Sequence, residues 1–181
     1  MYKRLKIHQL GAHPRMLRSI YRTLLRGPNF SGRHRAESVL RKALAPRPDN
    51  VAGGLKMLLD PQEWLQIDLM SGKPMEPMTT ALVQRLLAPD DTFVDVGAHV
   101  GWMSLQAAGR VGPAGRVVAV DPQPYNCDRI LANAALNGFA NIEVVVGAIS
   151  DIAGPLKLAN QSATDKARLT LRGPGVNDAS H

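Results

Sequence analysis

The sequence is poor in cysteine, in aromatic residues and in long apolar runs. Its 181 residues include one cysteine, Cys127, and 4% aromatic residues. One cysteine can form neither an internal disulfide nor a cysteine-based zinc cluster, so we expect no metal site and a reducing, cytoplasmic location. No apolar run reaches the roughly 18 residues that a transmembrane helix needs. The 45% hydrophobic and 20% charged residues then favour one globular domain.

The net charge of +7 is unevenly distributed. Residues 1–42 contain eleven Lys and Arg against one acid, Glu37, and carry +10, whereas the remaining residues carry −3. Residues 14–26 show the periodicity of an amphipathic helix, with Leu17, Ile20 and Tyr21 on its apolar side and arginines on another. We expect a basic helical extension over residues 1–50 whose charged face is solvated. The alternative is that this helix contacts a membrane surface or a polyanion.

The middle of the chain predicts further helices and a boundary. A second helix is expected over residues 35–45, and the Pro- and Gly-rich residues 46–54 are expected to form a linker to a domain over 51–181. Pro77 marks the start of another helix, with Met78, Leu82 and Leu86 on its buried face.

From residue 91 onward, strand and helix patterns alternate. Strands are expected over residues 92–96, 116–120 and 142–146, and helices over 101–110 and 125–136. The second and third strands are apolar enough to be buried in a sheet. Strand–helix–strand repeats with right-handed crossovers predict an α/β fold with a parallel sheet.

Residues that could bind a ligand follow all three predicted strands, at the sheet edge where α/β folds bind ligands. The first strand runs into the sequence D-x-G-x-x-x-G, whose Asp95, Gly97 and Gly101 allow a tight turn close to a ligand. Asp121 ends the second strand and can accept hydrogen bonds from the two hydroxyls of a ribose. Small and apolar residues around Ala148 follow the third strand and suit an adenine ring.

Together these residues predict a pocket for an adenosine-containing cofactor that has no pyrophosphate, because the G-x-G-x-x-G spacing is missing. The alternative is structural. Gly97 and Gly101 would then serve only as turn residues, and Asp95 and Asp121 would cap helices.

Residues 93–105, with the sequence FVDVGAHVGWMSL, resemble the first cofactor motif of class I S-adenosylmethionine-dependent methyltransferases, and more narrowly of the FkbM family of O-methyltransferases. The resemblance extends through GRVVAVDPQP at 115–124, LANAALNG at 131–138, LDP at 59–61 and GKPMEP at 72–77. It implies a Rossmann-like methyltransferase sheet and S-adenosylmethionine as the cofactor.

The resemblance also implies roles for individual residues. Gly97, Ala98, His99 and Gly101 would line the methionine end of the cofactor, while Asp121 would hold the ribose and Ala148 would lie beside the adenine. His99 stands where the family usually has asparagine, and Asp121 where it usually has glutamate. Met75 replaces a usual tyrosine before Glu76, which leaves a ligand role for that loop open.

The family's later acidic motif and the strands that follow it have no counterpart before residue 181. Two short segments, 155–158 and 168–171, are expected to pair as a hairpin. We therefore expect a truncated methyltransferase domain with about three core strands and no identifiable catalytic base.

The implied reaction is O-methylation of a small molecule or a sugar hydroxyl, with no nucleic-acid partner, because the body of the chain is acidic. Two alternatives remain open. In the first, the chain is an inactive remnant that acts as a cofactor-binding or interaction module. In the second, it is an RNA methyltransferase.

Overall fold

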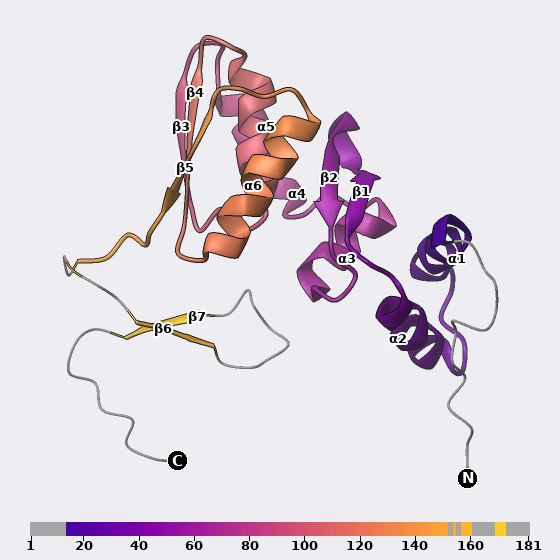
Figure 1. Cartoon of the computed structure of the whole chain (residues 1–181). Helices are drawn as coiled ribbons and strands as arrows, with labels where there is room; N and C mark the ends of the chain where they lie inside the picture. Colours follow the sequence, from indigo (N-terminus) through magenta and orange to yellow (C-terminus); the bar gives the residue numbers. More distant parts are fainter. Residues whose placement is uncertain (1–13, 152–153, 155–156, 161–168, 173–181) are drawn as a thin grey trace.

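The computed structural model describes residues 14–151, 154, 157–160 and 169–172 (Figure 1). None of the helices in this described part of the chain is long and apolar enough to cross a bilayer. In chain order the elements are α1 (Pro14–Arg26), α2 (Arg33–Ala43), β1 (Arg47–Asn50), the 3₁₀ turn η2 (Ala52–Gly54), β2 (Lys56–Leu59), α3 (Trp64–Ser71), α4 (Pro77–Leu86), β3 (Thr92–Val96), α5 (Trp102–Val111), β4 (Arg116–Asp121), α6 (Pro124–Leu136), β5 (Ile142–Val146), β6 (Lys157–Asn160) and β7 (Leu169–Arg172).

The centre of the fold is a parallel sheet with the order β3-β4-β5. Asp95 of β3 is in register with Ala119 of β4, which is in register with Val144 of β5. Helix α5 contacts β3 and β4, and α6 contacts β4 and β5, so both crossover helices lie on the same side of the sheet (Figure 1). The expected α/β fold with a parallel sheet is confirmed.

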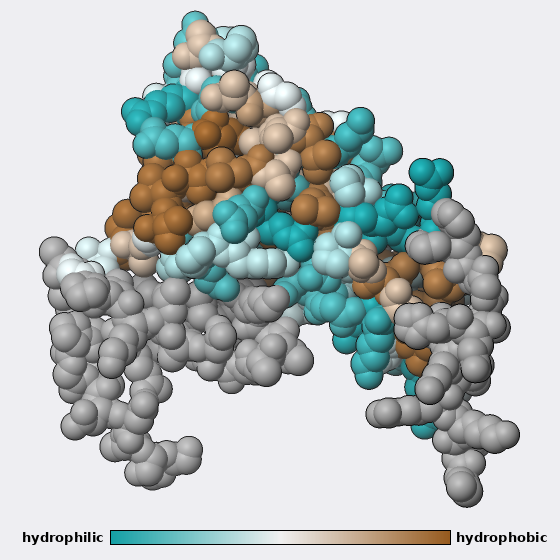
Figure 2. Space-filling view, viewed as in Figure 1, coloured by the Kyte–Doolittle hydropathy of each residue, from teal (hydrophilic) through white to brown (hydrophobic). Residues whose placement is uncertain are grey.

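The two faces of the sheet differ in burial. Val117 and Ala119 of β4 point toward the helices and are fully buried. Val94 of β3 and Val145 of β5 lie on the other face and are 55% and 39% exposed. The prediction that residues 142–146 form a buried strand is therefore wrong, because these residues are half-buried or exposed and the described helices cover only one face of the sheet. Figure 2 shows apolar residues at the surface over the region of the β3-β4-β5 sheet.

The segment predicted as a linker contains a strand instead. Strand β1 pairs antiparallel with β2, from Arg47 opposite Leu59 to Asn50 opposite Lys56. Pro48 is compatible with this strand because β1 has only one neighbour in its two-stranded sheet, and an edge strand tolerates a residue without an N–H. The two strands lie on either side of the expected domain boundary, which stays a prediction.

Helix α1 packs on the β1–β2 hairpin through its arginines. The Arg18 side chain, expected on a solvated face, is 5% exposed and donates from Nε to the Asp49 carboxylate at 2.8 Å. Arg22 also pairs with Asp49. Ile20, expected on the apolar side that is buried, is 44% exposed. Part of the basic extension therefore serves internal contacts, and a contact with a membrane surface stays a prediction.

Helix α4 also presents a different face from the one predicted. Met78, Leu82 and Leu86 are exposed, whereas Val83 packs against the core. Gln84 donates to the carbonyl of Gln106 on α5 at 3.0 Å. The apolar stripe points away because α4 contacts α5 through the opposite side of the helix.

Two asparagines of the α6 region tie β2 to the main body. Asn133 Oδ1 accepts from the Leu58 amide at 2.6 Å. Asn137 accepts from the Lys56 amide and donates to the Lys56 carbonyl, as a neighbouring strand would. Further along the chain, β6 and β7 pair antiparallel, which confirms the expected hairpin.

Candidate functional site

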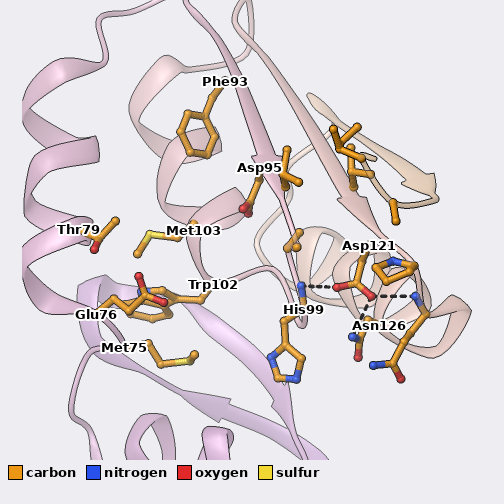
Figure 3. Close-up of a pocket in the computed structure, with 18 of the residues that line it drawn as sticks. Met75, Glu76, Thr79, Phe93, Asp95, His99, Trp102, Met103, Asp121 and Asn126 are labelled. Atoms are coloured by element: carbon orange, nitrogen blue, oxygen red, sulfur yellow. Dashed lines mark hydrogen bonds between the residues drawn. The ribbon is translucent and has the colours of Figure 1, made fainter. Parts of the chain in front are cut away.

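A cavity of about 640 Å³ opens at the carboxyl ends of β3, β4 and β5 (Figure 3). Its wall includes six of the seven residues that were predicted to bind a cofactor, namely Asp95, Gly97, Ala98, His99, Asp121 and Ala148. The seventh, Gly101, lies behind the loop. A Cβ atom built at Gly101 would approach Ile130 of α6 to 3.2 Å, so glycine allows α5 and α6 to pack closely there.

The loop after β3 has an unusual backbone conformation. Gly97 and Gly101 have positive φ angles of 79° and 86°, and the non-glycine residue His99 has a φ of 51°. The amides of Gly97 and Ala98 both donate to the Val120 carbonyl, at 2.8 and 3.1 Å. A Cβ atom built at Gly97 would meet no atom within 4 Å. The loop is thus held against β4 while its glycine leaves open space beside the cavity.

Asp121 links this loop to the next one. It is 4% exposed, and its Oδ2 accepts from the backbone amide of His99 at 2.8 Å. Its Oδ1 accepts from the Gln123 amide and from Asn126 Nδ2, both at 2.9 Å. A carboxylate offers about four acceptor sites, so three protein donors leave about one for a ligand.

Asp95 is partly buried at the start of the same loop. Its Oδ2 accepts from the Ser104 hydroxyl at 2.6 Å, so it holds the first turn of α5. Burial raises the pKa of the Asp95 carboxyl above its usual 3.8, the hydrogen bonds from Ser104 lower it, and the negative charges of Glu76 and Asp121 raise it further. Asp95 therefore supports the start of α5, as the structural alternative predicted, and also lines the cavity.

Replacing Asp95 with asparagine should stabilise the fold at neutral pH. The folded-state pKa of Asp95 is raised, so the folded state binds the proton more tightly than the unfolded state, and stability is lost as the pH rises through that pKa. The neutral amide of Asp95→Asn removes this cost and keeps an acceptor for Ser104. Urea denaturation of both proteins should show a stability gain at pH 7 that fades as the pH falls toward 3.8. An equal gain at every pH would contradict the assignment.

The cavity has a second wall that the sequence did not reveal. It is built from the end of the loop before α4 and from α4 and α5, and it includes Glu76, Thr79, Trp102 and Met103. The Trp102 indole donates to Thr80 Oγ1 at 3.0 Å, and Thr80 Oγ1 donates to the Met75 carbonyl at 2.9 Å. The signals for these residues were the resemblance around Glu76 and that of residues 93–105, which contain Trp102 and Met103. Helix periodicity gave none, since it placed the wrong face of α4 inward.

The charges on the cavity wall are of one sign. Three carboxylates line it, those of Glu76, Asp95 and Asp121. Among the residues that the structure describes, none that lines the cavity is Lys or Arg. Such a site favours a ligand that carries positive charge and disfavours phosphates.

Comparisons with known proteins find methyltransferases. The chain is 36% identical over 76 residues to an arsenite methyltransferase of Halobacterium salinarum, matching 42% of this chain and 18% of that protein. It is 33% identical over 107 residues to ribosomal RNA large subunit methyltransferase E of Sorangium cellulosum, matching 52% of this chain and 50% of that protein. The chain thus spans about half or less of the length of these curated relatives.

Among solved structures, a SAM-dependent methyltransferase of Aquifex aeolicus is 26% identical with a TM-score of 0.36, over 41% of this chain and 39% of that one. No family model matches the chain. The comparisons support the expected methyltransferase class and leave the FkbM family as a prediction. The expectation of no nucleic-acid partner receives no support, because one of these relatives is named for ribosomal RNA.

Proposed function

We propose that this chain carries the cofactor-binding part of an S-adenosylmethionine-dependent methyltransferase. The observation that carries the proposal is the meeting of the glycine loop, Asp121 and Ala148 around one cavity at the strand ends. Open space beside Gly97 and a wall of carboxylates fit a ligand with a sulfonium and an ammonium group. Relatives named methyltransferases support the same class.

Each wall of the cavity takes one part of the cofactor in this proposal. Gly97, Ala98 and His99 line the methionine end, with Gly101 setting the path of the loop behind them. Asp121 accepts one hydrogen bond from a ribose hydroxyl, because protein donors use its other acceptor sites. Ala148 lies beside the adenine. When bound, S-adenosylmethionine supplies an electrophilic methyl group.

For the acceptor, we propose the hydroxyl of a small molecule or a sugar, as in the FkbM family. The carboxylates on the cavity wall support an uncharged acceptor, since they would repel a phosphate backbone. An RNA acceptor is the second candidate, favoured by the relative named for ribosomal RNA and by the +10 charge of residues 1–42. Transfer of a labelled methyl group into RNA, and not into small hydroxyl compounds, would favour the second candidate.

Isothermal titration calorimetry tests the cofactor assignment. S-adenosylhomocysteine, the demethylated cofactor, should bind one to one. NAD should not bind, because its pyrophosphate meets three carboxylates and no G-x-G-x-x-G loop. Binding of NAD in preference to S-adenosylhomocysteine would refute the assignment. Cofactor binding without methyl transfer to any acceptor would favour the alternative of a non-catalytic binding module.

A further inference from the structure

Among the described residues, the Glu76 carboxylate makes no hydrogen bond that supports the fold. Glu76 is the residue before Pro77 at the start of α4, and its side chain makes no capping hydrogen bond with that helix. Within the described residues its carboxylate has no hydrogen bond and no ion pair. The side chain instead lies on the cavity wall.

The backbone around Glu76 is nevertheless held in place. Glu76 has a φ of 42°, in the left-handed region that non-glycine residues rarely adopt. Its carbonyl accepts from the Thr80 amide at 2.8 Å, and the Trp102–Thr80–Met75 hydrogen bonds fix the preceding residue. Trp102 directly follows Gly101, so the position of Glu76 is tied to the glycine loop.

Glu76 and Asp95 face the same part of the cavity. Their charges are close enough for Glu76 to disfavour ionisation of Asp95. Figure 3 shows Glu76 and Met103 on one side of Asp95, and His99 and Asp121 on the other. Two carboxylates without a cation on the wall repel each other, and a cationic group between them would relieve that repulsion.

We infer that Glu76 is a further binding residue, which together with Asp95 holds the α-ammonium group at the methionine end of the cofactor. This inference rests on the proposed function. With the ribose at Asp121 and the methionine at the glycine loop, the amino-acid end of the ligand extends toward the side of Asp95 where Glu76 lies. The nucleoside end lies at Asp121, on the other side. Glu76 should therefore affect only ligands that carry the amino-acid group.

Two ligands separate this inference from the proposed function. S-adenosylhomocysteine carries the ammonium group, whereas 5′-methylthioadenosine has the same nucleoside and a thioether but no amino acid. Glu76→Gln should weaken S-adenosylhomocysteine about fivefold, the upper range for an exposed charge pair, and should leave methylthioadenosine unchanged. The loss should shrink as the salt concentration rises, because the Glu76 side chain is exposed.

Two further variants control the experiment. Glu143→Gln removes an equal charge at the end of β5 that lies away from the cavity. It should change the affinity for neither S-adenosylhomocysteine nor methylthioadenosine. Thr80→Val removes the hydroxyl that links Trp102 to the Met75 carbonyl, next to Glu76, and changes no charge. This variant should weaken the binding of S-adenosylhomocysteine less than Glu76→Gln does, and should leave methylthioadenosine unchanged.

Three results would overturn the inference. An unchanged affinity for S-adenosylhomocysteine in Glu76→Gln overturns it while the proposed function stands. An equal loss for both ligands means that Glu76 supports the loop and does not bind the ammonium group. Failure of the unaltered protein to bind either ligand refutes the proposed function and the inference together.

Discussion

Replacing Asp121 with asparagine should lower the affinity for S-adenosylhomocysteine about a hundredfold. In the folded protein the Asp121 oxygens accept from His99, Gln123 and Asn126, and both loops that flank the cavity depend on these bonds. An asparagine presents an NH₂ group to one of these donors and offers a weaker acceptor to the ribose. Loss of the one charge-assisted hydrogen bond from the ribose, at about 3 kcal/mol, corresponds to this loss of affinity.

Calorimetry measures the loss, and Asp128→Asn provides the matched control. Asp128 lies on α6, seven residues after Asp121, and is exposed to solvent. The Asp128→Asn protein should bind the ligand as tightly as the unaltered chain. Circular dichroism shows whether the Asp121 variant remains folded. A folded Asp121→Asn protein that binds as tightly as the unaltered chain would remove Asp121 from the cofactor site.

Replacing Asp49 with alanine should lower the free energy of unfolding by about 3 kcal/mol. Asp49 compensates Arg18, whose side chain is 5% exposed and whose nearest contact with the carboxylate is 2.6 Å. Removing the carboxylate leaves a buried guanidinium group with backbone carbonyls as its remaining partners, among them the carbonyl of Ala45. The loss should be large because burial prevents water from replacing the lost partner.

Urea denaturation measures the stability of Asp49→Ala, and Asp68→Ala is the matched control. Asp68 is an exposed residue of α3 with no ion pair to a described residue, so its replacement should change stability by less than about 0.5 kcal/mol. If Arg18→Leu restores the stability of Asp49→Ala, the unpaired charge is the cause. Equal stability of Asp49→Ala and the unaltered chain would mean that α1 does not depend on this ion pair.

The sequence predicted the sheet well because its strands are short and apolar and are bounded by turns. Strands β3, β4 and β5 lie at the expected positions to within one residue. Strand ends in a parallel sheet converge on one edge, so Asp95, Asp121 and Ala148 could be placed together without any tertiary information. The use of three Asp121 acceptor sites by protein donors could not be predicted, because Asn126 reaches the carboxylate only once α6 is formed.

The errors arose where tertiary contacts override local pattern. The apolar stripe of α4 predicted a buried face, but contact with α5 turned Val83 inward and left Met78 exposed. Pro48 suggested a linker, although an edge strand tolerates it. Arg18 was expected in solvent because its partner, Asp49, is 31 residues away in the chain. None of these contacts leaves a periodic signal in the sequence.

The most direct test of a cofactor site at the strand ends is a heteronuclear NMR titration of the ¹⁵N-labelled chain with S-adenosylhomocysteine. The amide signals of Gly97, His99 and Gln123 should shift in a saturable manner, since these residues surround Asp121 and line the cavity. Signals of α1 should stay in place. Saturable shifts confined to α1 and α2, or no shifts at millimolar ligand, would contradict the account.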